Sequence, residues 1–536
     1  MFLFRPPQFP FLTLAVLLAA FGLIHFFVHF LYFLVIPQRA IERDERRDPE
    51  RLGRYLERVV ATPTPLVHEM KLGARLALAI FDQVRGRYAE AAAHCRTNLA
   101  VLVKHARVSR FASTEADHRL RLADCLEALG RADEADEERR LARACLDRAR
   151  DDYLRSMIQG RLLAREGRQA EACRAYERAL ALAPAWPRAA RLECVLLLSV
   201  ARQSAGEPAE SLRRAGEAIA LGARGAIARH AHRMAGIACI ELDRLDEAEQ
   251  HFRRAYDVAA DGGAPGERGE DLASLADILR RRGKLAEAHA AGLEAEGLSP
   301  GASRAGSGGG ETSLITIEAE PLGPQPLRMA IAVRSRVLAA WGRFDEAIAT
   351  LHRQADAPAL AVPAFDRRSR AIFALELARV EASSGRVDDA WDHVQEAVVE
   401  LGPDPKLGLQ CDAVASWVLA ARGLADDSRR VADLAGDRLP DPEVDPLAAR
   451  DLLHSLARAA IERGDPEEGE DLLDRFLDLN PSPVALPTAH YLRGECRRLL
   501  GDTPGASADY RAALAPNIDT HHARLARGRL GEMALS

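Results

Sequence analysis

Two close pairs of histidines are the first candidates for chemistry, because imidazole ligates metals and transfers protons near neutral pH. His230 and His232 lie two residues apart, and His521 and His522 are adjacent. Residues one or two positions apart on a helix point to different sides, so neither pair can hold one ion jointly. The sequence has no His-Glu-x-x-His motif, no Gly-x-Ser-x-Gly motif and no phosphate-binding loop. We therefore expect no metal, no cofactor and no catalytic residue, and we expect that the protein is not an enzyme.

Cysteines are the second candidates, and their spacing argues against chemistry as well. None of the eight belongs to a Cys-x-x-Cys pair, which excludes zinc ribbons, thioredoxin-like sites and c-type haem attachment. Most lie in apolar stretches with helical periodicity, where a free cysteine acts as a small buried hydrophobe. We therefore expect free thiols in a reducing compartment. The eight are Cys95, Cys125, Cys145, Cys173, Cys194, Cys239, Cys411 and Cys496.

The composition limits both the fold class and the partners. Charged residues make up 28% of the 536 residues, yet the formal net charge is only −6. A nucleic-acid-binding protein needs a basic excess for phosphate contacts, so we expect no nucleic-acid partner. Aromatic residues are scarce at 5%, whereas alanine, leucine, arginine and glutamate dominate. Because those four side chains lose little freedom in a helix, we expect an all-α fold.

The N-terminus departs from this composition. After a short segment at 1–10, residues 11–36 form a run of 26 residues without a formally charged side chain. At about 1.5 Å per residue, such a helix can span a hydrocarbon core about 30 Å thick. A cleavable signal peptide is the competing interpretation, but its apolar region should be shorter. We therefore predict one retained transmembrane helix.

Basic residues predict the orientation of this helix. Arg5 is the only lysine or arginine before it, whereas six arginines follow between positions 39 and 54. Cytoplasmic flanks carry the basic excess, so the charged segment 37–70 and the chain after it should be cytoplasmic, at a bacterial inner membrane. His25 and His29 lie on one face of the helix. They could ligate a metal or haem or contact a partner helix, but one helix supplies only two ligands and a neutral histidine near the interface is tolerated.

A short pattern recurs about eleven times between residues 71 and 516, and it predicts the elements that position every other side chain. Each copy has a glycine, or once an aspartate, between two apolar-periodic segments. Glycine there permits the left-handed conformation that ends a helix, so each copy predicts a helix, a turn and a second helix. Small residues recur five positions after the turn, and often eight before it, where two helices can approach closely. The turn residues are Gly86, Gly130, Gly167, Gly206, Asp243, Gly283, Gly342, Gly385, Gly423, Gly464 and Gly501.

This recurrence resembles the tetratricopeptide repeat (TPR) family. The most similar copy is the third, residues 153–184, which carries Gly160, Gly167, Ala172, Tyr176, Ala179 and Pro184 at that family's spacings. The turn-to-turn spacing departs from the family, because it is usually 37 to 44 residues here rather than about 34. The resemblance implies a non-catalytic α-solenoid that binds proteins. The Lys/Asn carboxylate clamp of chaperone-binding TPR domains is not recognisable in this sequence.

The spacing of the turns also predicts the domain organisation. Between Gly283 and Gly342 it rises to 59 residues, and the insertion contains a Gly/Ser-rich stretch typical of a flexible linker. We predict an N-terminal array at 71–298, a linker with a short extended segment at 299–327, and a C-terminal array at 328–516. Residues 517–536 should form the polar-faced helix that caps a solenoid.

Candidate binding residues follow from the resemblance, because the first helix of each TPR lines a concave groove. The position six residues before the turn gives Arg336, Arg379, Trp417 and Arg458 in four consecutive repeats. Arginine can bind a carboxylate with two hydrogen bonds and tryptophan supplies an apolar anchor, so these residues could bind an acidic peptide. Alternatively they are ordinary solvated positions, since arginine is abundant in this chain.

The equivalent positions of the N-terminal array predict a more apolar groove, which could accept an amphipathic helix or simply pack in the core. They are Ile80, Asp124, Arg161, Val200, Ile237 and Asp277. The whole sequence thus predicts a membrane-anchored scaffold or adaptor that mediates protein–protein interactions in the assembly of a membrane-associated complex. The alternative function is a non-catalytic accessory subunit of an envelope-biogenesis or membrane enzyme system.

Overall fold

The computed structural model describes residues 68–84, 87–105, 111–183, 188–260, 265–298, 325–355, 367–401, 405–441 and 445–535, with part of 54–61. The predicted transmembrane helix at 11–36, including His25 and His29, lies outside these residues, as does most of the predicted linker at 299–327. Within the described ranges every regular element is a helix, and none of these helices is long and apolar enough to cross a membrane. The all-α prediction is confirmed for this part of the chain.

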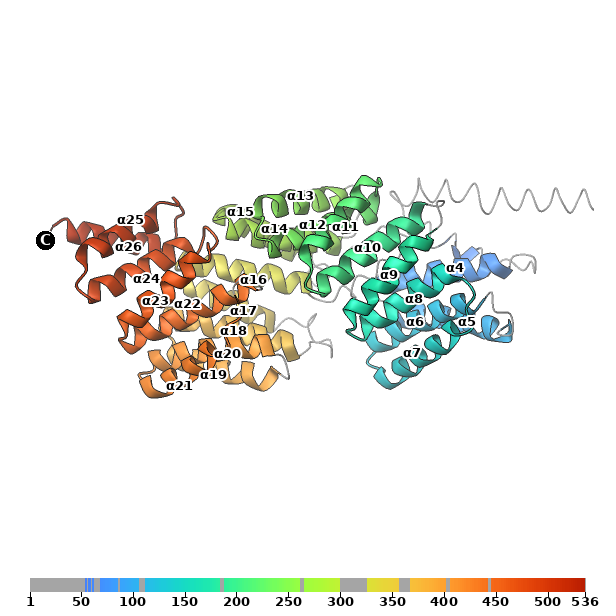
Figure 1. Ribbon diagram of the computed structural model, residues 1–536, viewed down its shortest axis with the longest axis horizontal. Helices are drawn as coiled ribbons and strands as arrows, with labels where there is room; N and C mark the ends of the chain where they lie inside the picture. The colour runs from blue at the N-terminus through green and yellow to red at the C-terminus, as the bar shows by residue number, and fades with distance from the viewer. Residues whose placement is uncertain are drawn as a thin grey trace, which may run out of the picture.

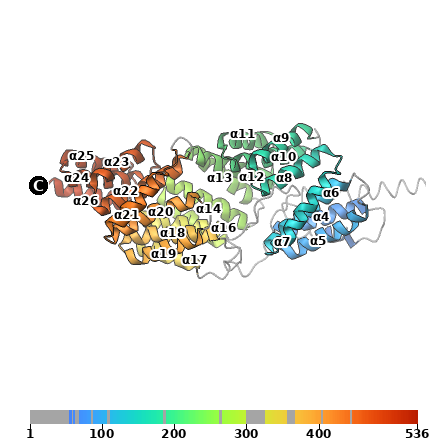
Figure 2. The ribbon, with the colours of Figure 1, turned by 60° about the horizontal axis from the view of Figure 1, so that its bottom comes forward.

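The helices pair into hairpins in the order that the predicted repeats require. Figures 1 and 2 show them stacked along one elongated solenoid, with α4–α9 at one end and α22–α26 at the other. A short 3₁₀ helix, η3 (Val103–His105), follows α5, and α26 (His521–Met533) lies in the predicted capping segment. The hairpins of the described chain are α4 (His68–Val84) with α5 (Tyr88–Leu102), α6 (Ala112–Ala128) with α7 (Ala132–Leu146), α8 (Asp152–Arg165) with α9 (Gln169–Leu182), α10 (Arg188–Ser204) with α11 (Pro208–Ala220), α12 (Gly225–Glu241) with α13 (Leu245–Ala260), α14 (Pro265–Arg281) with α15 (Leu285–Leu298), α16 (Gln325–Ala340) with α17 (Phe344–Ala355), α18 (Arg367–Ser384) with α19 (Val387–Glu400), α20 (Pro405–Ala421) with α21 (Ala425–Gly436), α22 (Pro446–Arg463) with α23 (Pro466–Asp478), and α24 (Leu486–Leu499) with α25 (Thr503–Leu514).

Every described turn has the backbone conformation that the sequence predicts. Nine turn glycines have φ between 73° and 86°, and Asp243 takes φ 59° at the one turn without glycine. The Gly167 N–H, for example, donates to the Ala164 carbonyl at 3.1 Å, so a carbonyl at the end of α8 is satisfied. Only Gly86 lies outside the described residues.

Small residues lie where the two helices of a hairpin cross, as predicted. All eleven residues five positions after a turn are buried. Where the residue eight before the turn is glycine, an aromatic ring of the second helix covers it, and an added Cβ would lie 2.5 to 2.7 Å from that ring. These glycines are therefore required by packing. The three pairs are Gly160 with Tyr176, Gly236 with Phe252, and Gly494 with Tyr510.

The helices on either side of the linker pack directly against each other. Leu285 of α15 lies in the same hydrophobic cluster as Val333 and Val337 of α16. Arg334 of α16 also forms an ion pair with Glu296 of α15. The stacking of hairpins therefore continues across the insertion that suggested a division into two arrays.

Successive turns of the superhelix touch each other, which the sequence did not predict. Asp243, in the turn between α12 and α13, pairs with Arg450 of α22 at 3.1 Å. The N–H of Val484, just before α24, donates to the Arg281 carbonyl at the end of α14, at 3.3 Å. The Val484 side chain lies in the hydrophobic cluster that α14, α15 and α16 share.

Residues near the C-terminus also contact turns that lie much earlier in the chain. Ile518 and His521 lie against two turn glycines: a Cβ added to Gly283 would be 2.2 Å from Ile518 Cδ1, and one added to Gly342 would be 2.7 Å from His521 Nδ1. Arg524 donates a hydrogen bond to the backbone carbonyl of Trp341. The turns after α12, α14 and α16 thus meet segments about five hairpins later in the chain. We call these interactions the inter-turn contact.

Candidate functional site

The four predicted binding residues lie on the first helices of four consecutive hairpins. Arg336 lies on α16, Arg379 on α18, Trp417 on α20 and Arg458 on α22. The structure brings these residues together in two pairs, one formed through a shared carboxylate and the other by direct contact. We call the surface that carries these four residues the inner surface.

Arg336 and Arg379 share the carboxylate of Glu376. Arg336 forms two hydrogen bonds with it, at 2.6 and 3.0 Å, and Arg379 forms one at 3.2 Å. Burial opposes the ionisation of Glu376, but the charge of Arg336 outweighs this effect and lowers the pKa of Glu376 to about 2. The charge of Glu376 in turn raises the pKa of Arg336. Most of the positive charge of Arg336 is therefore neutralised within the protein.

Trp417 and Arg458 form a cation–π pair. The Arg458 Cζ lies 4.2 Å from the centre of the Trp417 ring. Only 3% of Trp417 is exposed, so this side chain is not the accessible apolar anchor that we expected from the sequence. Burial lowers the pKa of Arg458 to about 10, and only the charge of Glu462 opposes that effect. Arg458 forms no ion pair with any residue in the described part of the chain.

Two neutral histidines lie within electrostatic range of Arg458. His454 lies one turn earlier on α22, and burial, together with the charges of Arg458 and Arg379, lowers its pKa to about 3. Burial and the charge of Arg458 also hold the pKa of His522 on α26 well below its usual value. The Nδ1 of His522 lies 3.2 Å from the Thr488 hydroxyl. Both imidazoles are therefore uncharged at neutral pH and add no positive charge to the inner surface.

A second cluster of charged side chains, on α14, extends the inner surface. Asp277 pairs with Arg280 at 2.8 Å and with Arg281 at 2.7 Å. Burial opposes its ionisation, but these two arginines, together with Arg336, lower the pKa of Asp277. Asp451 of α22 raises the pKa of Arg336 from the other side. This surface thus carries both arginines and carboxylates, and most of them are paired.

The N-terminal positions are used mainly for packing and for ion pairs between hairpins. Ile80 is 3% exposed and belongs to the core. Arg161, which is 4% exposed, bridges Asp117 at 2.8 Å and Glu193 at 2.7 Å. The sequence allowed either an apolar groove or core packing at these positions, and the structure favours packing.

Sequence reasoning missed Glu376 and His454, and it considered His522 only as a metal-ligand pair with His521. Glu376 lies three residues before Arg379, a spacing at which helical residues are neighbours, so that pair could have been found. Its bond to Arg336 spans 40 residues, which is close to the repeat length. A search for opposite charges one repeat apart would have found it, but no local signal points to His454.

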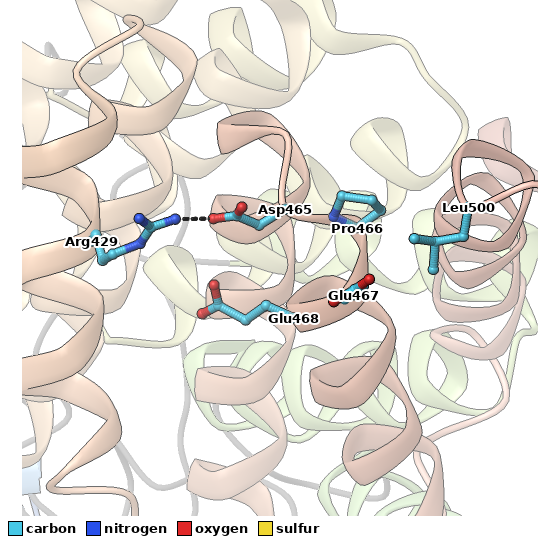
Figure 3. Close-up of a pocket in the computed structure, with 6 residues that line it drawn as sticks. All are labelled: Arg429, Asp465, Pro466, Glu467, Glu468 and Leu500. Atoms are coloured by element: carbon cyan, nitrogen blue, oxygen red, sulfur yellow. Dashed lines mark hydrogen bonds and ion pairs between the residues drawn. The ribbon is translucent and has the colours of Figure 1, made fainter.

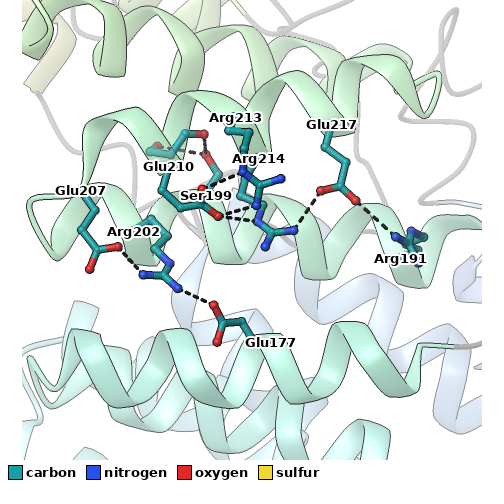
Figure 4. Close-up of polar contacts among 10 residues, drawn as sticks. Glu177, Arg191, Ser199, Arg202, Glu207, Glu210, Arg213, Arg214 and Glu217 are labelled. Atoms are coloured by element: carbon teal, nitrogen blue, oxygen red, sulfur yellow. Dashed lines mark hydrogen bonds and ion pairs between the residues drawn. The ribbon is translucent and has the colours of Figure 1, made fainter.

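Charged side chains elsewhere mostly join neighbouring helices. Figure 4 shows Arg202 of α10 between Glu177 of α9 and Glu207, the residue before α11. Arg214 of α11 bonds to Glu210 and Glu217, each at 3.0 Å. Such exposed pairs contribute little stability individually. They indicate solvated faces rather than a reactive centre.

The described residues show neither a metal-binding cluster nor an exposed thiol. The described residues contain no cluster of three or more histidine, cysteine or acidic side chains able to hold a metal. All eight cysteines are free and buried, as predicted, and burial raises the pKa of Cys125 to about 12. A shallow depression of about 320 Å³ lies between α21, α23 and α24, where Arg429 pairs with Asp465 (Figure 3).

The geometry defines the class of the protein as a TPR-type α-solenoid. Residues 196–265 and 454–520 match the family model of the tetratricopeptide repeat. These segments include the hairpins α12–α13 and α24–α25, which have the turn glycine or aspartate and the glycine–aromatic crossing described above. The chain therefore contains TPR repeats. Comparison with curated proteins found no match.

Several solved structures are similar to the chain at low sequence identity. A Rap protein complexed with competence and sporulation factor is 11% identical, with 68% of this chain and 98% of that chain covered and a TM-score of 0.48. A tetratricopeptide repeat protein from Parabacteroides merdae is 13% identical, with 56% and 97% covered and a TM-score of 0.34. The human IFIT1 dimer with m7Gppp-AAAA is 14% identical, with 78% and 81% covered and a TM-score of 0.34. The repeats themselves, rather than these similarities, establish the fold.

Proposed function

We propose that this protein is a non-catalytic scaffold, held at a membrane by residues 11–36, that binds a segment of a partner protein along the inner surface. The supporting observation is that Arg336, Arg379 and Arg458, from three different hairpins, lie on that one surface. A solenoid offers such a surface over several repeats, which suits an extended segment better than a compact ligand. The arginines on this surface outnumber the carboxylates that pair with them, which favours an acidic segment.

The membrane helix would serve this function by concentrating partners. A tether converts a second binding event into an intramolecular one, so the apparent affinity rises without any new contact. The run of arginines after residue 36 places the repeats in the cytoplasm in this proposal. The scaffold would thus assemble a complex on the cytoplasmic side of the membrane.

Site-specific photo-crosslinking tests the binding surface. A photo-reactive amino acid in place of Asp451, which is exposed and acts on Arg336, reports on the inner surface. The matched control replaces Arg430 on α21, whose side chain is 77% exposed and pairs only with Asp427 in the described chain. We expect a discrete crosslinked partner from position 451 in native membranes and none from position 430. The same partner from both positions, or from position 430 alone, would rule out the inner surface as the binding site.

Cysteine labelling tests the orientation. All eight native cysteines are buried, so they give a low background, and Leu535 is 91% exposed near the C-terminus. We expect Leu535→Cys to resist a membrane-impermeant maleimide in intact cells and to react after permeabilisation. Labelling in intact cells would contradict the cytoplasmic assignment.

A further inference from the structure

Arg458 differs from the other arginines of the inner surface in having no acidic partner. Arg336 and Arg379 share Glu376, and Arg280 and Arg281 share Asp277. Within the described chain, Arg458 contacts the Trp417 ring and forms no ion pair. A guanidinium that is partly withdrawn from water without an anionic partner is unfavourable, and an anionic ligand would remove that penalty.

The contact with Trp417 holds the Arg458 side chain in place. Trp417 is 3% exposed and cannot move easily, and the guanidinium carbon lies 4.2 Å from the centre of its ring. A cation–π contact uses the face of the guanidinium, so the N–H groups at its edge stay available to a ligand. Because the arginine is already fixed, less side-chain entropy is lost when it binds an anion.

The neighbours of Arg458 select the kind of anion. His454 and His522 are neutral at pH 7, and each can donate a hydrogen bond without adding charge. Arg379 is partly neutralised by Glu376. Arg458 thus carries a positive charge that no carboxylate pairs with directly, and Glu462 offsets this charge only from a distance. A carboxylate, with a single negative charge and two acceptor oxygens, matches this better than a phosphate group, which carries about −1.5 to −2.

We infer that Arg458 is the primary contact of a carboxylate-binding centre on the inner surface, with His454 and His522 within electrostatic range. This inference rests on the proposed function, since it names the chemical group of the partner segment that the scaffold recognises. The carboxylate belongs to a peptide, either to an acidic side chain or to a chain terminus. Arg336 lies on the same surface, but it is not part of the centre because its guanidinium is already hydrogen-bonded to Glu376.

Fluorescence anisotropy on the full chain in detergent micelles tests this inference with two labelled probes. Hexaglutamate with an amidated C-terminus offers only side-chain carboxylates, and hexaglycine with a free C-terminus offers only a terminal one. We expect at least one probe to bind with a salt-sensitive affinity. Arg458→Gln should weaken that binding about tenfold or more, as expected for the loss of a charge-assisted bidentate contact.

Two matched variants separate binding from folding. Arg458→Lys keeps the charge and should retain part of the affinity, and Arg430→Gln, at an exposed position on α21, should leave it unchanged. Circular dichroism checks that every variant is folded. Unchanged affinity in folded Arg458→Gln would overturn the inference, and so would failure of both probes to bind the unaltered chain. Displacement of the probe by inorganic phosphate at lower concentration than by acetate would overturn the preference for a carboxylate. The crosslinking experiment tests the scaffold function separately, because it requires no particular ligand chemistry.

Discussion

Replacing Gly236 with alanine tests whether the crossing of two helices, rather than helix propensity, limits the stability of a hairpin. Gly236 lies inside α12, and its backbone has no left-handed φ. An added Cβ would lie 2.5 Å from Phe252 Cε2 and 2.7 Å from Cδ2. Phe252 is 1% exposed and belongs to the largest hydrophobic cluster, so its ring cannot move without displacing its neighbours.

Two opposing effects of comparable size determine the outcome. Alanine in a helix interior is about 1 kcal/mol more favourable than glycine, whereas overpacking a core costs about 1 to 3 kcal/mol. We therefore expect Gly236→Ala to destabilise the hairpin by up to about 2 kcal/mol. Gly216→Ala on α11 is the matched control, because nothing lies within 4 Å of its added Cβ. It should stabilise its helix by about 0.5 to 1 kcal/mol.

Native-state hydrogen exchange is the suitable assay, because repeat proteins open locally and a single global unfolding free energy does not describe them. Amide protection in α12 and α13 should fall in Gly236→Ala, and protection in α11 should rise in Gly216→Ala. Adding Phe252→Leu to Gly236→Ala should restore part of the lost protection, since the smaller side chain makes room for the Cβ. If both alanine variants change protection in the same direction by similar amounts, the ring does not limit the approach of the helices.

Three other outcomes follow from the described contacts. Ala172→Trp should disrupt the α8–α9 crossing at a cost of about 1 to 3 kcal/mol or more, seen as lost protection in that hairpin, because Ala172 has no exposed surface. Arg450→Ala should loosen the inter-turn contact locally by removing the partner of Asp243, while the contacts of Val484, Ile518 and Arg524 keep the superhelical turns together, and unchanged exchange near α22 would contradict this. The hydrogen bond to Glu381 raises the pKa of His393 above 6.5, so its stabilisation of the α18–α19 hairpin is complete below pH 6.5 and is lost as the pH rises through the raised value. His393→Gln should abolish this pH dependence of amide protection, whereas a hairpin more stable at higher pH would refute it.

The hairpins could be predicted from the sequence because each depends on residues close together in the chain. The left-handed turn needs one permissive residue, and the crossing needs small side chains at two fixed offsets from it. Even the exception obeyed this rule, since Asp243 takes the same left-handed conformation as the glycines. The resemblance to TPR proteins then suggested which helix of each hairpin faces inward, and that assignment stays a prediction.

The sequence does not predict whether a residue of the inner surface is paired, covered or exposed, because this depends on residues of the neighbouring hairpin. Glu376, 40 residues beyond Arg336, neutralises that arginine. Arg458, 41 residues beyond Trp417, covers the indole. The inter-turn contact was still harder to predict from the sequence, since Arg450 and Asp243 are separated by 207 residues. No periodicity within one repeat specifies how many repeats complete one turn of the superhelix.

The inter-turn contact also has a mechanical consequence. In an open solenoid each hairpin contacts only its neighbours, so small rotations between neighbouring hairpins add up to a large change in the length of the molecule. Here the turns after α12, α14 and α16 are joined to segments about five hairpins later, so the intervening hairpins cannot rotate independently. Extension of this half of the molecule first requires that the joined turns separate. The part of the molecule that carries the inner surface is therefore held at its length by contacts between distant hairpins, and a pull along the solenoid must break these contacts before that part can extend.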